Sequence, residues 1–147
     1  MNPVINEFSS SDRQDAKSLI LNLLKDFGFE YSPIYDFDLE DPYKHYIEKG
    51  GMFYVLKVNN KVIGTVAIIN KGKTAELKRL YVDTNYQGKK FGSMLLDRAI
   101  QFCKDNGFTK LEFETNKKFK KAHLLYQRRG FKIVKEDDRS YYMEKNL

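Results

Sequence analysis

Residues 77–96 constrain the fold more than any other stretch, because the sequence changes there from strand-like to helix-like within a few positions. The stretch reads LKRLYVDTNYQGKKFGSMLL. Residues 80–82 favour a strand, residues 83–85 interrupt it, and an amphipathic helical pattern follows. The first N–H groups of a helix lack partners within the helix and, together with the helix dipole, attract anions. The stretch therefore predicts a strand, a turn that binds a phosphate-bearing ligand, and a helix.

The rest of the chain alternates between short strand and helix patterns. Asn59-Asn60-Lys61 separates two apolar runs and predicts a hairpin. We expect strands over residues 4–8, 52–58, 62–69, 74–82, 110–115, 131–134 and 140–145. We expect helices over residues 10–27, 88–106 and 119–129, and a loop with a short helix over 29–50. These patterns predict one mixed α/β domain over residues 1–147.

Composition limits the class of protein. A chain of 147 residues suits a single core, and 41% hydrophobic with 31% charged residues is typical of soluble globular proteins. No apolar run has the length of a membrane span, and the N-terminus lacks a secretory pattern, so the cytoplasm is the default location. The single cysteine, Cys103, excludes an internal disulfide and suits a buried position. His45 and His123 lack the spacing of metal ligands, so we expect no metal.

The net charge of +6 is unevenly distributed, with an acidic region over residues 26–48 and a basic region over 117–132. A basic region can bind a polyanionic cofactor or nucleic acid, and it can also be a solvated helix face. No helix-turn-helix, RRM or zinc pattern accompanies it, so a nucleic-acid-binding module is the weaker alternative.

The turn resembles the pyrophosphate loop of the GNAT superfamily of acyl-CoA-dependent N-acetyltransferases. The family pattern of that loop is Gln or Arg, any two residues, Gly, any one residue, and then Gly or Ala. In this chain Gln87, Phe91 and Gly92 match the pattern, whereas Lys90 replaces the usual central Gly. A second signature, Ala-x-x-Leu-Tyr before Gly-Phe, is matched by Ala122, Leu125, Tyr126, Gly130 and Phe131. The resemblance implies a central, mostly antiparallel mixed sheet of about seven strands with about four helices, and acetyl-CoA as the cofactor.

The resemblance also implies roles for individual residues. Glu76 would be the general base, with a solvent-facing strand residue or a water chain as the alternatives. Tyr126 would protonate the leaving thiolate, with an aromatic core position as the alternative. Asn116 would bind the pantetheine arm or act only as a turn residue or helix cap. The expected cofactor-binding set is Leu80, Tyr81, Val82, Gln87, Gly88, Lys89, Lys90, Phe91, Gly92, Ser93, Asn116 and Tyr126.

Acceptor recognition is expected in the aromatic and acidic segment over residues 29–50. Tyr31, Tyr35, Asp36 and Asp38 are the candidate substrate-binding residues, because carboxylates beside aromatic faces suit a cationic amine. The predicted activity is transfer of an acetyl group from acetyl-CoA to a primary amine of a small cationic molecule, peptide or protein, by direct attack on the thioester. A CoA-binding sensor without turnover is the main alternative. We expect no nucleic-acid or membrane partner, and a monomer or homodimer.

Overall fold

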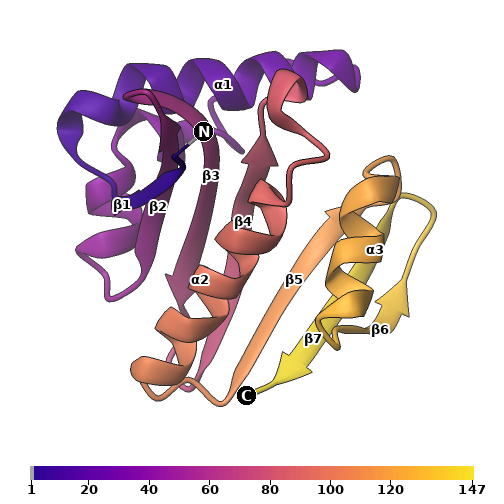
Figure 1. The fold of residues 1–147 in the computed structure, drawn as a ribbon. Coiled ribbons are helices and arrows are strands. Elements are labelled where there is room, and N and C mark those ends of the chain that lie inside the picture. The colour runs from indigo at the N-terminus through magenta and orange to yellow at the C-terminus, as the bar shows by residue number, and fades with distance from the viewer. Residues whose placement is uncertain (1) are drawn as a thin grey trace.

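The computed structural model describes residues 2–147 and is built on one seven-stranded sheet (Figure 1). The order across the sheet is β1-β2-β3-β4-β5-β7-β6, and β4 and β5 form its parallel pair while every other neighbouring pair is antiparallel. The strands are β1 (Val4–Glu7), β2 (Met52–Val58), β3 (Lys61–Asn70), β4 (Thr74–Val82), β5 (Lys110–Asn116), β6 (Lys132–Glu136) and β7 (Ser140–Asn146). The predicted mixed, mostly antiparallel sheet is confirmed.

Four helices flank the sheet, as predicted: α1 (Arg13–Asp26), the short π-helix η3 (Tyr43–Ile47), α2 (Phe91–Asp105) and α3 (Lys120–Arg128). Short 3-10 turns accompany them: η1 (Ser10–Asp12), η2 (Phe37–Glu40) and η4 (Thr84–Tyr86). The prediction that a helix begins at Gly88 is wrong by three residues. Gly88 and Lys90 have φ values of +79° and +67°, and this left-handed backbone delays the start of α2 until Phe91.

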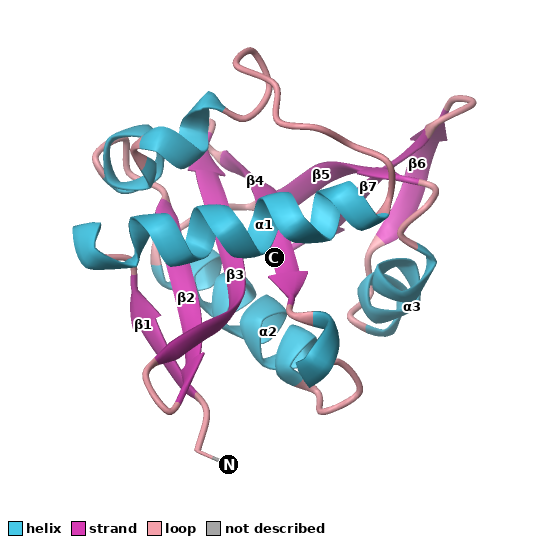
Figure 2. Ribbon diagram, turned by 90° about the horizontal axis from the view of Figure 1, so that it is seen from above, coloured by secondary structure: helices cyan, strands magenta, loops and turns pink. Residues whose placement is uncertain are grey.

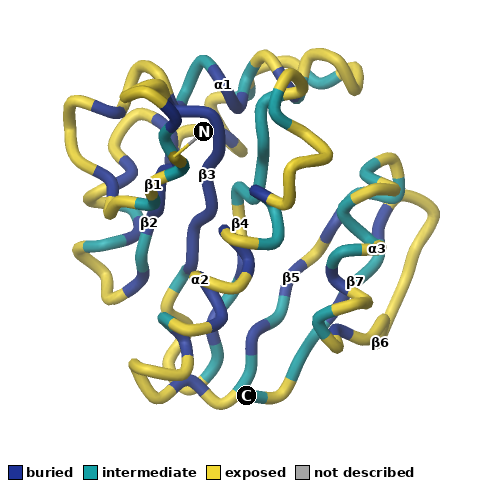
Figure 3. Tube along the Cα trace, in the orientation of Figure 1, coloured by how far each residue is buried: buried dark blue, intermediate teal, exposed yellow. Residues whose placement is uncertain are grey.

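The helices cover the two faces of the sheet unequally. Figure 2 shows α1 on one face and α2 on the other. The core is accordingly divided into a larger cluster beneath α2 and α3 and a smaller one beneath α1 and η3. β3 contributes buried residues to both clusters and is dark along most of its length in Figure 3.

One glycine sets the distance between α2 and the sheet. A Cβ added at Gly64 of β3 would lie 2.8 Å from Leu95 Cδ1 of α2 and 3.3 Å from the Tyr81 carbonyl oxygen. A side chain here would push α2 away from β3 and β4. Gly64 therefore helps to place the N-terminal half of α2 over the end of β4.

Candidate functional site

The parallel strands β4 and β5 separate after a short paired region. Their ladder joins only Thr74–Glu76 to Lys110–Glu112, although β4 continues to Val82 and β5 to Asn116. Figure 1 shows the two strands diverging toward their C-terminal ends, where α2 begins. The second half of β4 therefore has one edge that is not covered by any strand of residues 2–147.

A β-bulge at Arg79 changes which side chains face which layer. Arg79 has a φ of +58°, and the register between β3 and β4 shifts between Thr65 and Ala67. Before the bulge, Ala75 and Leu77 pack in the cluster beneath α2; after it, Leu80 and Val82 do so. The extra residue thus reverses the odd–even alternation of the strand. Tyr81 packs on the α1 side instead.

The open edge of β4 presents the backbone of Leu80 and Val82. The Asp83 amide donates to the Ile63 carbonyl at 2.8 Å, and Tyr81 pairs with Thr65, so alternation directs the Leu80 and Val82 peptide groups away from β3. The Gln87 side chain donates to the Val82 carbonyl at 3.0 Å. An extended, amide-bearing ligand could pair with the remaining groups as an added strand would.

The turn between β4 and α2 is rich in unpaired N–H groups. The backbone amides of residues 88–90 donate to no acceptor within residues 2–147, and those of residues 91–93 begin α2, where no acceptor exists inside the helix. Lys90 at the N-cap position provides no side-chain cap. Residues 87–90 are exposed, so a ligand can reach these groups. A run of free amides at a helix start is a suitable site for a phosphate group.

Lys90 adopts the backbone conformation that a glycine adopts without strain. Its φ of +67° and ψ of +15° are left-handed, which costs a residue with a Cβ about 1 kcal/mol. The lysine thus keeps the turn geometry of the glycine that the resemblance places there. Its amide stays available to a ligand.

Tyr126 of α3 lies on the α2 side of the sheet. Its ring packs against Phe113 of β5 and Phe131, with centroids 4.4 Å and 6.0 Å away. Burial, followed by the negative potential of Tyr81, raises the pKa of the Tyr126 phenol above its ordinary value. No hydrogen bond to its hydroxyl is found within residues 2–147. The phenol therefore stays protonated at neutral pH and is available to donate to a ligand.

Glu76 lies at the last rung that joins β4 to β5, opposite Glu112. Because Ala75 and Leu77 pack beneath α2, the Glu76 side chain projects to the α1 side. It is 24% exposed, and its oxygens lie 3.8 Å from Lys71 Nζ and 3.7 Å from Lys78 Nζ. Glu76 and Tyr126 thus approach the divergence of the strands from opposite faces.

The expected acceptor residues divide into two kinds. Asp36 and Asp38 are buried and accept hydrogen bonds from the Arg79 guanidinium at 3.0 Å and 2.7 Å. Tyr46 also donates to Asp38 at 2.6 Å. Burial acts to raise the pKa of Asp38, but the hydrogen bonds and charge of Arg79 outweigh it and hold the pKa below its usual value. These carboxylates anchor the 29–50 segment to the bulge rather than facing a ligand.

The aromatic members of the expected acceptor set are exposed. Tyr35 is 81% exposed, and only its backbone is engaged: its carbonyl accepts from Arg79 at 3.3 Å, and its amide donates to Ser32 Oγ at 3.3 Å. Tyr31 is 40% exposed and donates to Glu40, which also pairs with Lys17. The structure therefore brings Asp36 and Asp38 together with Arg79, but it leaves the side chains of Tyr31 and Tyr35 outside that cluster.

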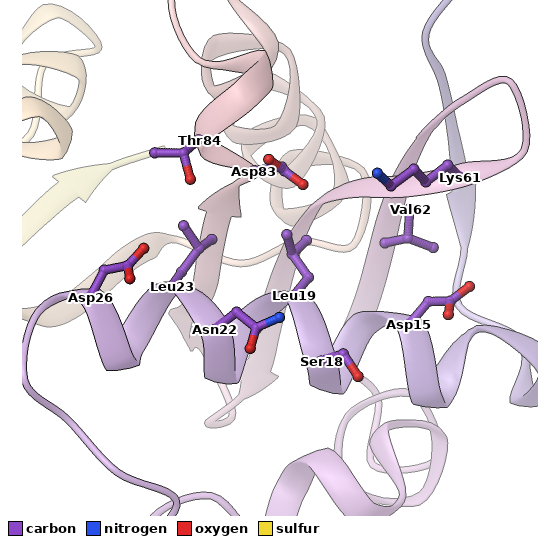
Figure 4. Close-up of a pocket in the computed structure, with 10 residues that line it drawn as sticks. All are labelled: Asp15, Ser18, Leu19, Asn22, Leu23, Asp26, Lys61, Val62, Asp83 and Thr84. Carbon is purple, nitrogen blue, oxygen red and sulfur yellow. The ribbon is translucent and has the colours of Figure 1, made fainter.

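A cavity of about 420 Å³ lies between α1 and the ends of β3 and β4. Figure 4 shows Leu19 and Leu23 rising from α1 between the polar side chains that edge it. Its lining includes the carboxylates of Asp15, Asp26 and Asp83. Three carboxylates oppose a polyphosphate, so this cavity does not suit the phosphates of a nucleotide cofactor.

A second cavity of about 320 Å³ lies beyond the end of β5 and is lined by Phe29, Asn116, Lys117, Lys118, Asp138 and Arg139. Phe119 connects it to the open edge of β4, with centroids 6.2 Å from Phe29 and 6.4 Å from Tyr81. Of the residues that line this cavity, Asn116 belongs to the expected cofactor-binding set, and Lys117 and Lys118 belong to the basic region. The others are brought together by chain crossings that no local pattern reveals.

The fold and the divergent strands define a class: a single α/β domain with a helix-start anion site beside an open strand edge. A family model described as "Acetyltransferase (GNAT) family" matches residues 18–131. The chain belongs to the GNAT acetyltransferase family, which is a family of acyltransferases. No helix within residues 2–147 has both the length and the hydropathy needed to cross a membrane.

Relatives by sequence carry N-acetyltransferase names. The N-acetylaspartate synthetase of Xenopus tropicalis is 32% identical over 100 residues, covering 66% of this chain and 37% of that protein. An uncharacterized N-acetyltransferase of Schizosaccharomyces pombe is 30% identical over 127 residues, covering 84% and 78%. The chain spans less than half the length of the first curated relatives it matches.

Solved structures share the whole fold. A GNAT-family acetyltransferase from Staphylococcus aureus Mu50 superposes with a TM-score of 0.92 at 26% identity, covering 99% of both chains. The PaiA N-acetyltransferase of Thermoplasma acidophilum, solved in complex with coenzyme A, superposes with a TM-score of 0.84 at 21% identity, covering 100% of both. The latter likeness concerns the fold alone.

Proposed function

We propose that this chain transfers the acetyl group of acetyl-CoA to a primary amine by direct attack of the amine on the thioester. One observation carries the proposal: the unpaired amides of residues 88–93 lead directly into the open edge of β4. A diphosphate on these amides and an extended arm along Leu80 and Val82 would direct a thioester toward the divergence of β4 and β5. The coenzyme A complex of the PaiA structure supports this choice of ligand.

The proposed chemistry uses two proton-transferring side chains, one on each face of the sheet. An alkylamine has a pKa of about 10.4 and is mostly protonated near pH 7, so it must lose a proton before it can attack. Glu76, on the α1 side, is the proposed base, acting directly or through water. The amine nitrogen attacks the carbonyl carbon, the carbon–sulfur bond breaks, and Tyr126 gives its proton to the departing thiolate. The acylated nitrogen loses its second proton to solvent to give the neutral amide. After the products leave, Tyr126 recovers a proton from solvent and Glu76 releases the one that it took from the amine.

The assignment of Asn116, Leu80 and Val82 to the pantetheine arm remains part of the proposal, as does that of residues 87–93 to the phosphates. The Asn116 side chain already accepts a hydrogen bond from the Lys118 amide at 2.9 Å. Its NH₂ group and one remaining lone pair of Oδ1 are then available to the arm. Among the substrate-binding candidates, the exposed Tyr31 and Tyr35 keep a proposed role at the acceptor entrance. Asp36 and Asp38 are proposed to position that segment.

Cofactor binding is tested by comparing two ligands in isothermal titration calorimetry. Gly92→Pro removes one N–H from the unpaired amides of residues 88–93, and proline is tolerated in the first turn of a helix. We expect it to weaken CoA binding at least tenfold and to leave the binding of pantetheine, which lacks the diphosphate, unchanged. Equal affinity of the variant and the wild type for CoA would show that the diphosphate binds elsewhere.

Turnover and the base are tested by release of free thiol from acetyl-CoA. We expect Glu76→Gln to lower kcat/KM by about 10²-fold near neutral pH, and to lower it most at low pH, where neutral amine is scarce. Glu112→Gln is the matched control, because Glu112 lies on the same rung and also contacts Lys71. A wild-type protein that binds CoA and releases no thiol with any amine would instead be a sensor.

A further inference from the structure

The second cavity is lined by residues from three separate parts of the chain. Phe29 follows α1, Asn116 ends β5 and is followed by Lys117 and Lys118, and Asp138 and Arg139 belong to the turn between β6 and β7. It contains no residue of the turn over 87–93, so it is distinct from the proposed diphosphate site. Phe119 packs against both Phe29 of the cavity and Tyr81 of the open β4 strand. A molecule in this cavity would therefore lie beside the open end of β4, on the sheet face to which Tyr81 and Glu76 project.

The backbone at Arg139 is held from both sides. Its amide donates to Asp137 Oδ1 at 2.8 Å, and its carbonyl accepts from the Lys117 amide at 2.8 Å. The next residue, Ser140, also donates its amide to Asp137 Oδ1, at 2.8 Å. The position of Arg139 at the cavity is therefore fixed by the β6–β7 turn rather than by its own side chain.

Lys118 is fixed at the cavity by contacts with the segment that follows α1. Its ammonium donates to the Phe27 carbonyl at 3.2 Å and lies 5.0 Å from the centre of the Phe29 ring. Its amide donates to Asn116 Oδ1 at 2.9 Å. These contacts orient the ammonium without neutralising it, because a carbonyl and an aromatic ring carry no net charge.

The cavity thus contains charges of both signs that lack a partner of opposite charge. Within residues 2–147, no carboxylate lies within 4.0 Å of the cationic groups of Lys118 or Arg139, and no cation lies within 4.0 Å of the carboxylate of Asp138. Lys117 differs, because its ammonium pairs with Glu136 at 2.8 Å. Two unpaired cations and one unpaired carboxylate suit a ligand that carries both an anionic and a cationic group.

We propose that this cavity binds the acceptor and that the acceptor is a small amine bearing a carboxylate, of the amino-acid class. The proposal rests on the proposed acetyl transfer. Arg139 and Lys118 bind the carboxylate, and Asp138 attracts the ammonium form of the same molecule from solution. The Phe29 ring covers the apolar part of the acceptor.

The ion pairs that carboxylates of the 29–50 segment already form within the protein favour this acceptor over a polycation. Asp36 and Asp38 share the guanidinium of Arg79, and Glu40 pairs with Lys17. Three of the six carboxylates that predict a cationic acceptor are therefore already paired within the protein. The second cavity presents the cations of Lys118 and Arg139, which would repel a polycation.

The test is a thiol-release assay with matched acceptors at saturating acetyl-CoA. The panel contains the standard L-amino acids, the α-carboxamide of each, and putrescine. We expect the preferred amino acid to exceed its own amide and putrescine by at least tenfold in kcat/KM. We expect Arg139→Gln to raise KM for that amino acid about tenfold and to leave kcat and the rate with its amide nearly unchanged. Arg13→Gln, an equal charge change at the far end of α1, serves as the control and should alter none of these values.

The outcomes separate this inference from the proposed function. Turnover of amides or putrescine at rates equal to amino acids would overturn the amino-acid proposal and leave acetyl transfer intact. If CoA binds and no amine is acetylated, binding of the same amino acids measured by ligand-observed NMR decides the matter. Binding that Arg139→Gln weakens tenfold would uphold the cavity as an amino-acid site, and absence of binding to the wild type would refute it.

Discussion

Replacement of Tyr126 by phenylalanine should lower the rate of acetyl transfer without changing the free energy of unfolding. The Tyr126 hydroxyl has no hydrogen-bond partner within residues 2–147, while the ring packs among Phe113 and Phe131. Removing an oxygen that makes no protein hydrogen bond leaves no orphaned partner, so the free energy of unfolding should change by less than about 0.5 kcal/mol. A large loss of stability would mean that the hydroxyl has a structural partner.

The expected loss of rate follows from the acidities of the two groups. A thiol has a pKa of about 8.5 and a phenol of about 10, so the phenol is the weaker acid and holds its proton, the more so because burial raises the pKa of Tyr126. The phenol therefore stabilises the departing thiolate first by a hydrogen bond, and the proton follows as the sulfur leaves. General acids contribute about 10²- to 10⁴-fold, and a thiolate leaves readily enough to place this one at the lower end. We therefore expect Tyr126→Phe to lower the single-turnover rate about 10²-fold, which corresponds to about 2.7 kcal/mol of transition-state stabilisation.

Single-turnover thiol release across a pH series tests this reasoning. Below a pH of about 8.5 the departing thiolate benefits from a proton, whereas above it the free thiolate is stable in water. The ratio of wild-type to variant rates should therefore shrink as the pH rises through that value. The dissociation constant of acetyl-CoA should stay within twofold of the wild type. A ratio that is the same at every pH, or a loss confined to cofactor affinity, would refute the role of Tyr126 as an acid.

Two further predictions concern the backbone of the site. Lys90→Gly relieves the left-handed strain, so it should leave the free energy of unfolding unchanged or raise it by up to about 1 kcal/mol. Lys89→Gly should instead lower the free energy of unfolding by about 0.5–1 kcal/mol. Urea titration measures both values, and the opposite ranking would contradict the strain at Lys90. Arg79→Met strands two buried carboxylates and should lower the free energy of unfolding by about 3 kcal/mol, whereas the exposed Lys78→Met should change it by less than about 0.5 kcal/mol. A loss below 1 kcal/mol at Arg79 would show that the carboxylates find other partners.

The sequence predicts those parts of the fold that local periodicity controls. The Asn59-Asn60 hairpin is confirmed, and both residues take the left-handed φ that such turns require. The end of α2 is also local, because Gly107 follows the helix with a φ of +78°. The start of α2 is harder to predict, because Lys90 occupies a conformation that lysine rarely adopts. Nothing in the propensity of a lysine indicates this.

The site is less predictable because its contacts join distant residues. Asp36 and Asp38 lie more than forty positions from Arg79, and only the folded chain shows that their charges are engaged. The nearest local signal is Arg79 itself, which follows Lys78 and so breaks the alternation of apolar and polar residues in β4. Lys118 meets the Phe27 carbonyl across 91 positions, so the second cavity has no sequence signature. Tyr126 and the turn over 87–93 can be recognised from the sequence, because each lies within one short motif.

The bulge at Arg79 connects the stability of the fold to the geometry of the site. Without the extra residue, Tyr81 would point toward α2, and Leu80 and Val82 would direct their peptide groups toward β3 rather than toward the open edge. The bulge is held by the Thr65 hydroxyl, which donates to the Arg79 carbonyl at 2.7 Å, and by the two carboxylates of the 29–50 segment. The same buried ion pairs therefore place the acceptor-side segment and keep the strand edge free. A substitution that breaks them should impair cofactor binding and acceptor binding together, although Arg79 belongs to neither surface.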